Sequence, residues 1–214
     1  MPLLKNKQHD HDPLWHVQVV LAMLIALQLF LPKHFNFLPQ YVLPGLEFIC
    51  LVLLQIVTPK KAVFNSSLRR VVVLVLIVLV AIANATSLQF LLQMLFEAKR
   101  IDAVSLLVSA FTIYVTNVVV FGMLYWEIDG GGPGSRHDNM RDENDFLFPQ
   151  QQNKETKWIP TFIDYIYVSV TNAMAFSPTD TMPLSRRAKV LMTLQAFLAL
   201  LTIAVIAARA VNTL

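Results

Sequence analysis

Charged residues are scarce in this chain. Asp, Glu, Lys and Arg make up 14% of its 214 residues, against about 25% in ordinary soluble domains. Hydrophobic residues make up 56%. This composition excludes an ordinary soluble protein and predicts an integral membrane protein whose main partner is the lipid bilayer. The formal net charge of +3 is too small to indicate nucleic acid as a partner.

Cysteine is nearly absent, and residues that carry catalysis are not grouped. The single cysteine, Cys50, lies in an apolar run, which excludes a disulfide framework within the chain. The alternating His and Asp residues at 9–12 lie in a polar tail with no scaffold to orient metal ligands. No nucleophile has a base placed beside it in the sequence. We therefore expect no enzymatic activity, no metal and no cofactor.

Long apolar runs are what the sequence has in abundance. Crossing about 30 Å of hydrocarbon takes about 20 helical residues. Five runs approach or exceed that length, at residues 14–31, 42–57, 71–95, 103–126 and 190–211. They predict five transmembrane helices.

Two features of these runs are polar. Glu47 lies in the first turn of the second run, and an acid at membrane depth is a candidate functional residue, although this one lies near enough to the interface to reach water. One face of the fourth run carries Ser105, Ser109, Thr112 and Thr116. Such a stripe favours close packing of helices, with a water-lined face as the alternative.

Between the fourth and fifth runs lies a polar segment rich in glycine. Residues 127–157 contain seven acidic and four basic residues. We interpret this segment as a solvated loop outside the membrane. Its apolar patch, Asp145–Pro149, is suited to fold back onto the membrane surface.

A shorter apolar stretch follows the loop, and it reads KWIPTFIDYIYVSVTNAMAF from residue 157. Pro160 and Thr161 suit a first helical turn, and Asp164 complements the helix dipole. The pattern predicts a helix from Thr161 to about Ala173, roughly 20 Å long and too short to cross a bilayer. Pro178 ends it. The polar residues that follow must return to a surface, so we predict a re-entrant half-helix.

The stretch from Asp164 to Pro183 resembles the pore helix and selectivity filter of potassium-channel-like tetrameric pore-loop proteins. Their pattern runs Asp, two residues, Tyr, an aromatic residue, Ser, then a Thr-Val-Gly-Tyr-Gly-Asp filter, two residues and Pro. In this chain Asp164, Tyr167, Ser169, Asp180 and Pro183 fall in register without a gap. The following apolar run resembles the inner helix of the same family. The resemblance covers only the C-terminal half of the chain.

The resemblance implies an all-α integral membrane fold of five transmembrane helices plus a re-entrant pore half-helix. Residues 1–100 would carry the N-terminal tail and three helices. Residues 101–214 would form the pore-like module, and four copies would assemble around one axis. In this module we expect an outer helix at 103–126, a polar loop at 127–158, a pore helix and filter-like loop at 159–185, and an inner helix at 187–213.

The filter positions depart from the family pattern. They are occupied by Ala175, Phe176, Ser177, Pro178 and Thr179. Potassium filters use two glycines to present a ring of backbone carbonyls, and Pro178 also fixes its own φ. The resemblance therefore does not extend to potassium selectivity.

The remaining candidate lining residues are Thr171, Asn172 and Asp180, and a ring of four Asp180 carboxylates would favour cations. We expect a homotetramer that conducts monovalent cations with weak selectivity. The alternative is a non-conducting membrane protein that keeps the fold, either a small-molecule carrier or a scaffold, with Phe176 closing the axis.

Two arguments on orientation conflict. The resemblance places the loop outside the cell. The positive-inside rule favours the opposite, because only Lys33, Lys99, Arg100 and Arg209 of the 17 basic residues lie on the side away from the loop. We favour a cytoplasmic N-terminus, in a bacterial inner (plasma) membrane.

Overall fold

The structure is a computed structural model. It describes residues 67–96, 103–137, 144–152, 158–174 and 180–213. Of the first two apolar runs it describes ten residues, all helical, and nothing else of residues 1–66. Glu47 and the filter positions 175–179 lie outside the described residues.

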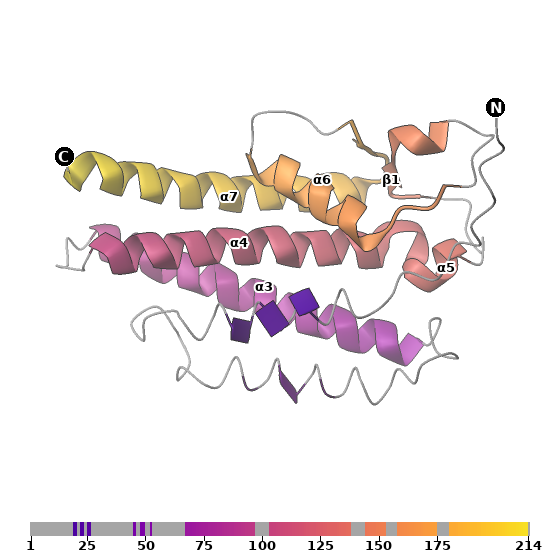
Figure 1. Cartoon of the computed structure of the whole chain (residues 1–214), viewed down its shortest axis with the longest axis horizontal. Coiled ribbons are helices and arrows are strands. Elements are labelled where there is room, and N and C mark those ends of the chain that lie inside the picture. Colours follow the sequence, from indigo (N-terminus) through magenta and orange to yellow (C-terminus); the bar gives the residue numbers. More distant parts are fainter. Residues whose placement is uncertain are drawn as a thin grey trace, which may run out of the picture.

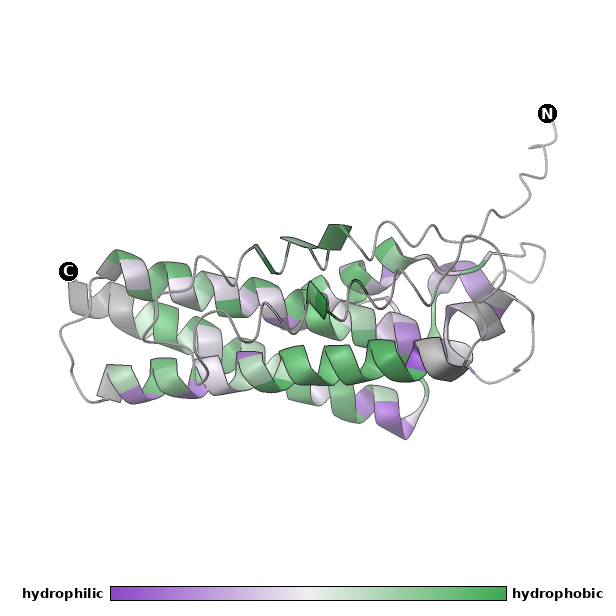
Figure 2. Cartoon of the chain, turned by 90° about the horizontal axis from the view of Figure 1, so that it is seen from below, coloured by the Kyte–Doolittle hydropathy of each residue, from purple (hydrophilic) through white to green (hydrophobic). Residues whose placement is uncertain are grey.

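Three long helices dominate the described part of the chain, which is shown in Figure 1. They are α3 (Ser67–Phe96), α4 (Ala103–Ile128) and α7 (Arg186–Thr213). Each contains a segment long and apolar enough to cross a membrane. The third, fourth and fifth predicted spans are thus confirmed as helices, and their length and composition indicate a membrane protein. Figure 2 shows apolar residues along most of these helices, with hydrophilic residues gathered mainly at the end that carries the polar loop.

Helix α4 lies between α3 and α7 and contacts both (Figure 1). Leu88 and Leu91 of α3 pack with Leu106 and Ile113 of α4 in one buried cluster. The amide of Asn84 donates a hydrogen bond of 3.1 Å to the carbonyl of Ile113, where α4 is closely approached by α3. A polar side chain at this depth therefore ties the two helices together.

The hydroxyl stripe of α4 is buried. Ser109, Thr112 and Thr116 are 0%, 3% and 2% exposed, and the hydroxyl of Ser109 donates to the carbonyl of Ser105 at 2.7 Å. These side chains are covered by protein, which confirms the prediction of close packing over that of a water-lined face.

Three consecutive glycines end α4. Gly130, Gly131 and Gly132 have φ values of 56°, 86° and 101°, a region that favours glycine. They form the turn through η2 (Asp129–Gly131) into α5 (Pro133–His137). The chain continues through β1 (Phe146–Leu147) and η3 (Pro149–Gln152). The glycine run thus folds the loop back over the end of the bundle.

The prediction of a solvated loop is wrong where the loop adjoins the bundle, because Asp129 and the three glycines that follow it are buried. The apolar patch is buried as well. Phe146 and Phe148 are 0% and 3% exposed. The ring of Phe146 lies 5.2 Å from that of Tyr125, and the ring of Phe148 lies 5.3 Å from that of Tyr165, measured between centroids. The apolar patch therefore packs onto the protein core, not onto the membrane surface, because it covers aromatic rings at the ends of α4 and α6.

Helix α6 (Phe162–Met174) has nearly the bounds predicted for the short helix. Its first turn carries Asp164 as predicted, and the side chain of this residue also caps the helix. The carboxylate of Asp164 accepts hydrogen bonds from the backbone N–H of Thr161 at 2.7 Å and from its hydroxyl at 2.8 Å. After the filter positions, β2 (Met182–Pro183) pairs antiparallel with β1, with Phe146 opposite Pro183 and Leu147 opposite Met182. The chain then enters α7.

Candidate functional site

The C-terminal end of α6 lies beside the middle of the long helices. Ala173 is fully buried in a cluster with Val118 of α4 and Ala199 of α7. Both partners lie near the centres of their helices. The 13 residues of α6 give a length of about 20 Å, so the helix runs from the loop end of the bundle to about half its depth (Figure 1).

A glycine lets α6 approach α4 closely. A Cβ added to Gly122 would lie 2.6 Å from Cδ1 of Ile166, 3.3 Å from its Cα and 3.4 Å from Cβ of Ser169. The hydroxyl of Ser169 donates to the carbonyl of Val118 at 2.5 Å, one turn away along α4. The short helix is therefore held against the backbone of α4.

Four polar side chains join α4, α6 and α7 near the end of the short helix, and we call them the Gln195 network. Tyr125, Ser169 and Gln195 are all 0% exposed, and Asn172 is half-buried. Oε1 of Gln195 accepts from the Tyr125 hydroxyl at 2.6 Å and from Nδ2 of Asn172 at 2.8 Å. Nε2 of Gln195 donates to the hydroxyl and to the carbonyl of Ser169, at 2.6 Å and 3.0 Å. Polar groups so far from water are stable only with such partners.

A second polar cluster, at the loop end, fixes the start of α6. Oδ1 of buried Asp129 accepts from the backbone N–H groups of Asp145 and Phe146, at 2.6 Å and 3.1 Å. Its Oδ2 accepts from the hydroxyl of Tyr165. The guanidinium of Arg136 lies 5.0 Å from the centroid of the Tyr165 ring. It also donates to the carbonyls of Trp126 and Asp129, at 2.7 Å and 2.5 Å.

The same cluster holds the segment that follows the filter positions. The guanidinium of Arg187 binds both carboxylate oxygens of Asp145, at 2.5 Å and 2.6 Å. The backbone N–H of Leu184 donates to the carbonyl of Asp145 at 2.8 Å. With the β1–β2 pairing, these contacts tie the start of α7 to the polar loop. We refer to the Asp145–Arg187 pair and this pairing as the loop clamp.

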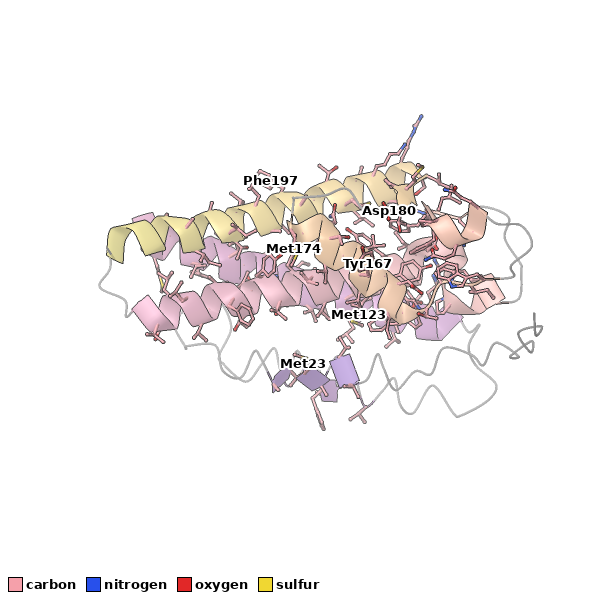
Figure 3. All side chains as sticks on the ribbon, turned by 45° about the horizontal axis from the view of Figure 1, so that its top comes forward. Met23, Met123, Tyr167, Met174, Asp180 and Phe197 are labelled. Carbon is pink, nitrogen blue, oxygen red and sulfur yellow. The ribbon has the colours of Figure 1, made fainter. Side chains whose placement is uncertain are left out.

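The predicted lining residues that the structure describes have three different environments. The hydroxyl of Thr171 donates to carbonyls of its own helix, at Tyr167 and Val168. The amide of Asn172 points to α7, where it also donates to the carbonyl of Met192 at 2.9 Å. Asp180 is exposed, and Figure 3 shows it near the first turns of α7, at the loop end. Ala175, Phe176, Ser177, Pro178, Thr179 and Glu47 lie outside the described residues.

Helices α6 and α7 both carry exposed apolar side chains in the single chain. Figure 3 labels Tyr167 and Met174 on α6 and Phe197 on α7. The exposed hydrophobic residues are Ile163, Tyr167 and Met174 on α6 and Val190, Leu194, Phe197 and Leu200 on α7. A second apolar surface must cover these side chains, either lipid or another copy of the chain.

Sequence reasoning missed Gly122, Tyr125, Gln195 and the Asp145–Arg187 pair. For Gln195 a signal was present, since an amide inside a spanning helix requires a partner. Nothing in the sequence names that partner. Among the residues that the structure describes, no group of His, Cys, Asp or Glu side chains is arranged to hold a metal ion. No family model, curated protein or solved structure matches the chain significantly.

Proposed function

We propose that this protein is a channel-like membrane protein in which four copies enclose a weakly cation-selective pathway. The observation that carries the proposal is the position of α6. It begins at the loop end, and its last turn lies beside Val118 and Ala199, half-way along two helices of spanning length. A helix that ends at that depth is a re-entrant element, because the chain must come back to the loop end to reach β2.

The C-terminal end of α6 provides a negative electrostatic potential that favours a cation. The last carbonyls of a helix have no partners within the helix, and they carry the negative end of its dipole. Carbonyl groups facing hydrocarbon are costly, so this end must meet water or protein. Ile163, Tyr167 and Met174 leave one side of α6 open in the single chain. Symmetry-related copies around an axis would cover that side and enclose a polar path.

The charges at the mouth of such a path are mixed, which supports weak selectivity. Asp180 is exposed at the loop end and would attract cations. Arg186 and Lys189 are also exposed, in the first turns of α7 a short way along the chain. The charge of Arg187 is compensated by Asp145. The opposing effects of these groups predict a modest preference for cations over anions.

Proteoliposome flux of purified protein tests this account. We expect a flux of monovalent cations that exceeds the chloride flux by a small factor. Asp180→Asn should lower the cation-to-anion ratio, whereas Arg186→Gln combined with Lys189→Gln should raise it. Opposite changes in this ratio for the acidic and the basic residues would show that their electrostatic field at the entrance of the pathway sets the selectivity. Flux that is indifferent to both changes would contradict the role given to Asp180.

Native mass spectrometry in several detergents tests the assembly. The proposal requires a tetramer, and a monomer or dimer in every detergent would overturn the symmetric pathway. A tetramer without flux would favour the alternative, a carrier or scaffold with the same architecture.

We also propose that the loop end faces the cytoplasm. The N-terminal ends of α3 and α7 lie at this end, with Arg69, Arg70, Arg136, Arg186, Arg187 and Lys189. The opposite end of the described helices carries Arg209. Because Lys and Arg are concentrated on the cytoplasmic side of membrane proteins, this asymmetry supports a pore loop that enters from the cytoplasm.

A further inference from the structure

Gln195 is the point at which the short helix is joined to α7. Its side chain is fully buried, and it contacts α4 through Tyr125 and α6 through Ser169 and Asn172. Both ends of the amide are used, since Oε1 accepts two hydrogen bonds and Nε2 donates two. An amide has one acceptor oxygen with two lone pairs and two donor hydrogens. Every hydrogen-bond donor and acceptor of the Gln195 amide is therefore used.

The bonds from Gln195 reach the last two turns of α6. Ser169 and Asn172 lie on consecutive turns of one face of this helix, which ends at Met174. The hydroxyl of Ser169 passes the network on to the carbonyl of Val118 in α4. Two successive turns of α6 are thus hydrogen-bonded, one to both α4 and α7 and the next to α7. These bonds fix the rotation of α6 about its axis and its depth along α7.

The direction of Asn172 follows from the same geometry. Its amide donates to Gln195 and to the carbonyl of Met192, both in α7. This side chain is thereby turned toward the core of the subunit. It acts on the pathway through the position of α6 and not as a lining group.

We infer that Gln195 is the positioning residue for α6, setting the depth and rotation of its last two turns. Movement of α7 would be transmitted to these turns through this residue. The effect on permeation rests on the proposed function, whereas the effect on α6 does not.

The test is hydrogen–deuterium exchange of the full-length protein in lipid nanodiscs, with Gln195→Leu as the main variant. The substitution keeps the side-chain volume nearly unchanged and leaves the Tyr125 hydroxyl and the Asn172 amide without their shared partner. We expect amide exchange in residues 169–174 to rise roughly tenfold or more, with exchange in α3 unchanged. Gln89→Leu, on an exposed face of α3, is the matched control and should leave both regions unchanged.

A second, milder variant gives a result even if Gln195→Leu does not fold. Tyr125→Phe removes a single donor to Gln195 and should give a smaller rise in the same segment. In the double variant the rise should be no larger than in Gln195→Leu alone, because both changes remove the same bond. Additive effects, or equal increases in all helices, would refute a specific link.

Permeation supplies the readout that packing alone would not change. At equal yields of tetramer, Gln195→Leu should alter the ratio of permeabilities among monovalent cations, and Gln89→Leu should not. If the wild-type protein does not conduct while Gln195→Leu still speeds exchange in α6, the proposed function fails and the positioning role stands. Unchanged exchange in α6 for both Gln195→Leu and Tyr125→Phe would overturn the inference.

Discussion

Breaking the loop clamp should have an effect that depends on which partner is removed. The side chain of Asp145 is 2% exposed and that of Arg187 is 50% exposed. Removing one partner of a fully buried ion pair costs about 3–5 kcal/mol, because the other charge remains buried and uncompensated. In this pair only the carboxylate is in that situation, since the guanidinium has access to water.

The expected magnitudes follow from that asymmetry. Arg187→Gln leaves the Asp145 carboxylate buried without a cation and should lower the free energy of unfolding by about 2–3 kcal/mol. Asp145→Asn leaves a half-exposed guanidinium that water can solvate, and should cost about 1 kcal/mol. The backbone bond from Leu184 to the carbonyl of residue 145 is retained in both variants.

Denaturant unfolding of the purified protein in one detergent measures both changes. Arg209→Gln is the control, because it removes one positive charge at the opposite end of α7. The double variant Asp145→Asn/Arg187→Gln should be more stable than Arg187→Gln alone, since no carboxylate is then left unpaired. Equal losses for the two single variants, or a loss for Arg187→Gln no larger than for the control, would refute this reasoning.

Two further predictions concern other contacts, and a third concerns the orientation of the protein in the membrane. Gly122→Leu should destabilise the protein by about 1–3 kcal/mol, because the new side chain would meet Ile166 of α6, and denaturant unfolding measures the loss. Phe146→Ala should cost about 3 kcal/mol in the same assay, because the ring is fully buried against Tyr125. With Cys50 replaced by alanine, Ser135→Cys should resist a membrane-impermeant thiol reagent in intact cells and react after lysis. Labelling in intact cells would place the loop end outside.

The short helix was predictable because its signals are local. Thr161 and Asp164 form a cap three residues apart, and the apolar run ends after too few residues to span a bilayer. The three described long helices were equally predictable, since the length and hydropathy of the apolar runs determine them. Such features depend on neighbours in sequence, so their bounds were close to those found.

The contacts that position the short helix were not predictable, because they join residues far apart in the chain. Tyr125 of α4 and Gln195 of α7 are 70 positions apart in the chain, and nothing in either helix alone selects the other. The prediction of a solvated polar loop was wrong for a related reason. Its acidic residues suggested full solvation, yet Asp129 and Asp145 are buried with their own hydrogen-bond partners, and Phe146 covers the rings beside them.

Cation permeation is measured by the reversal potential in planar-bilayer recordings of the purified protein under a gradient of potassium chloride. Discrete currents should reverse on the cation-selective side of zero, well short of the potassium equilibrium potential. Asp180→Asn should move the reversal potential toward zero. An absence of current from protein that is tetrameric in the same preparation, or a reversal potential that Asp180→Asn leaves unchanged, would contradict the account.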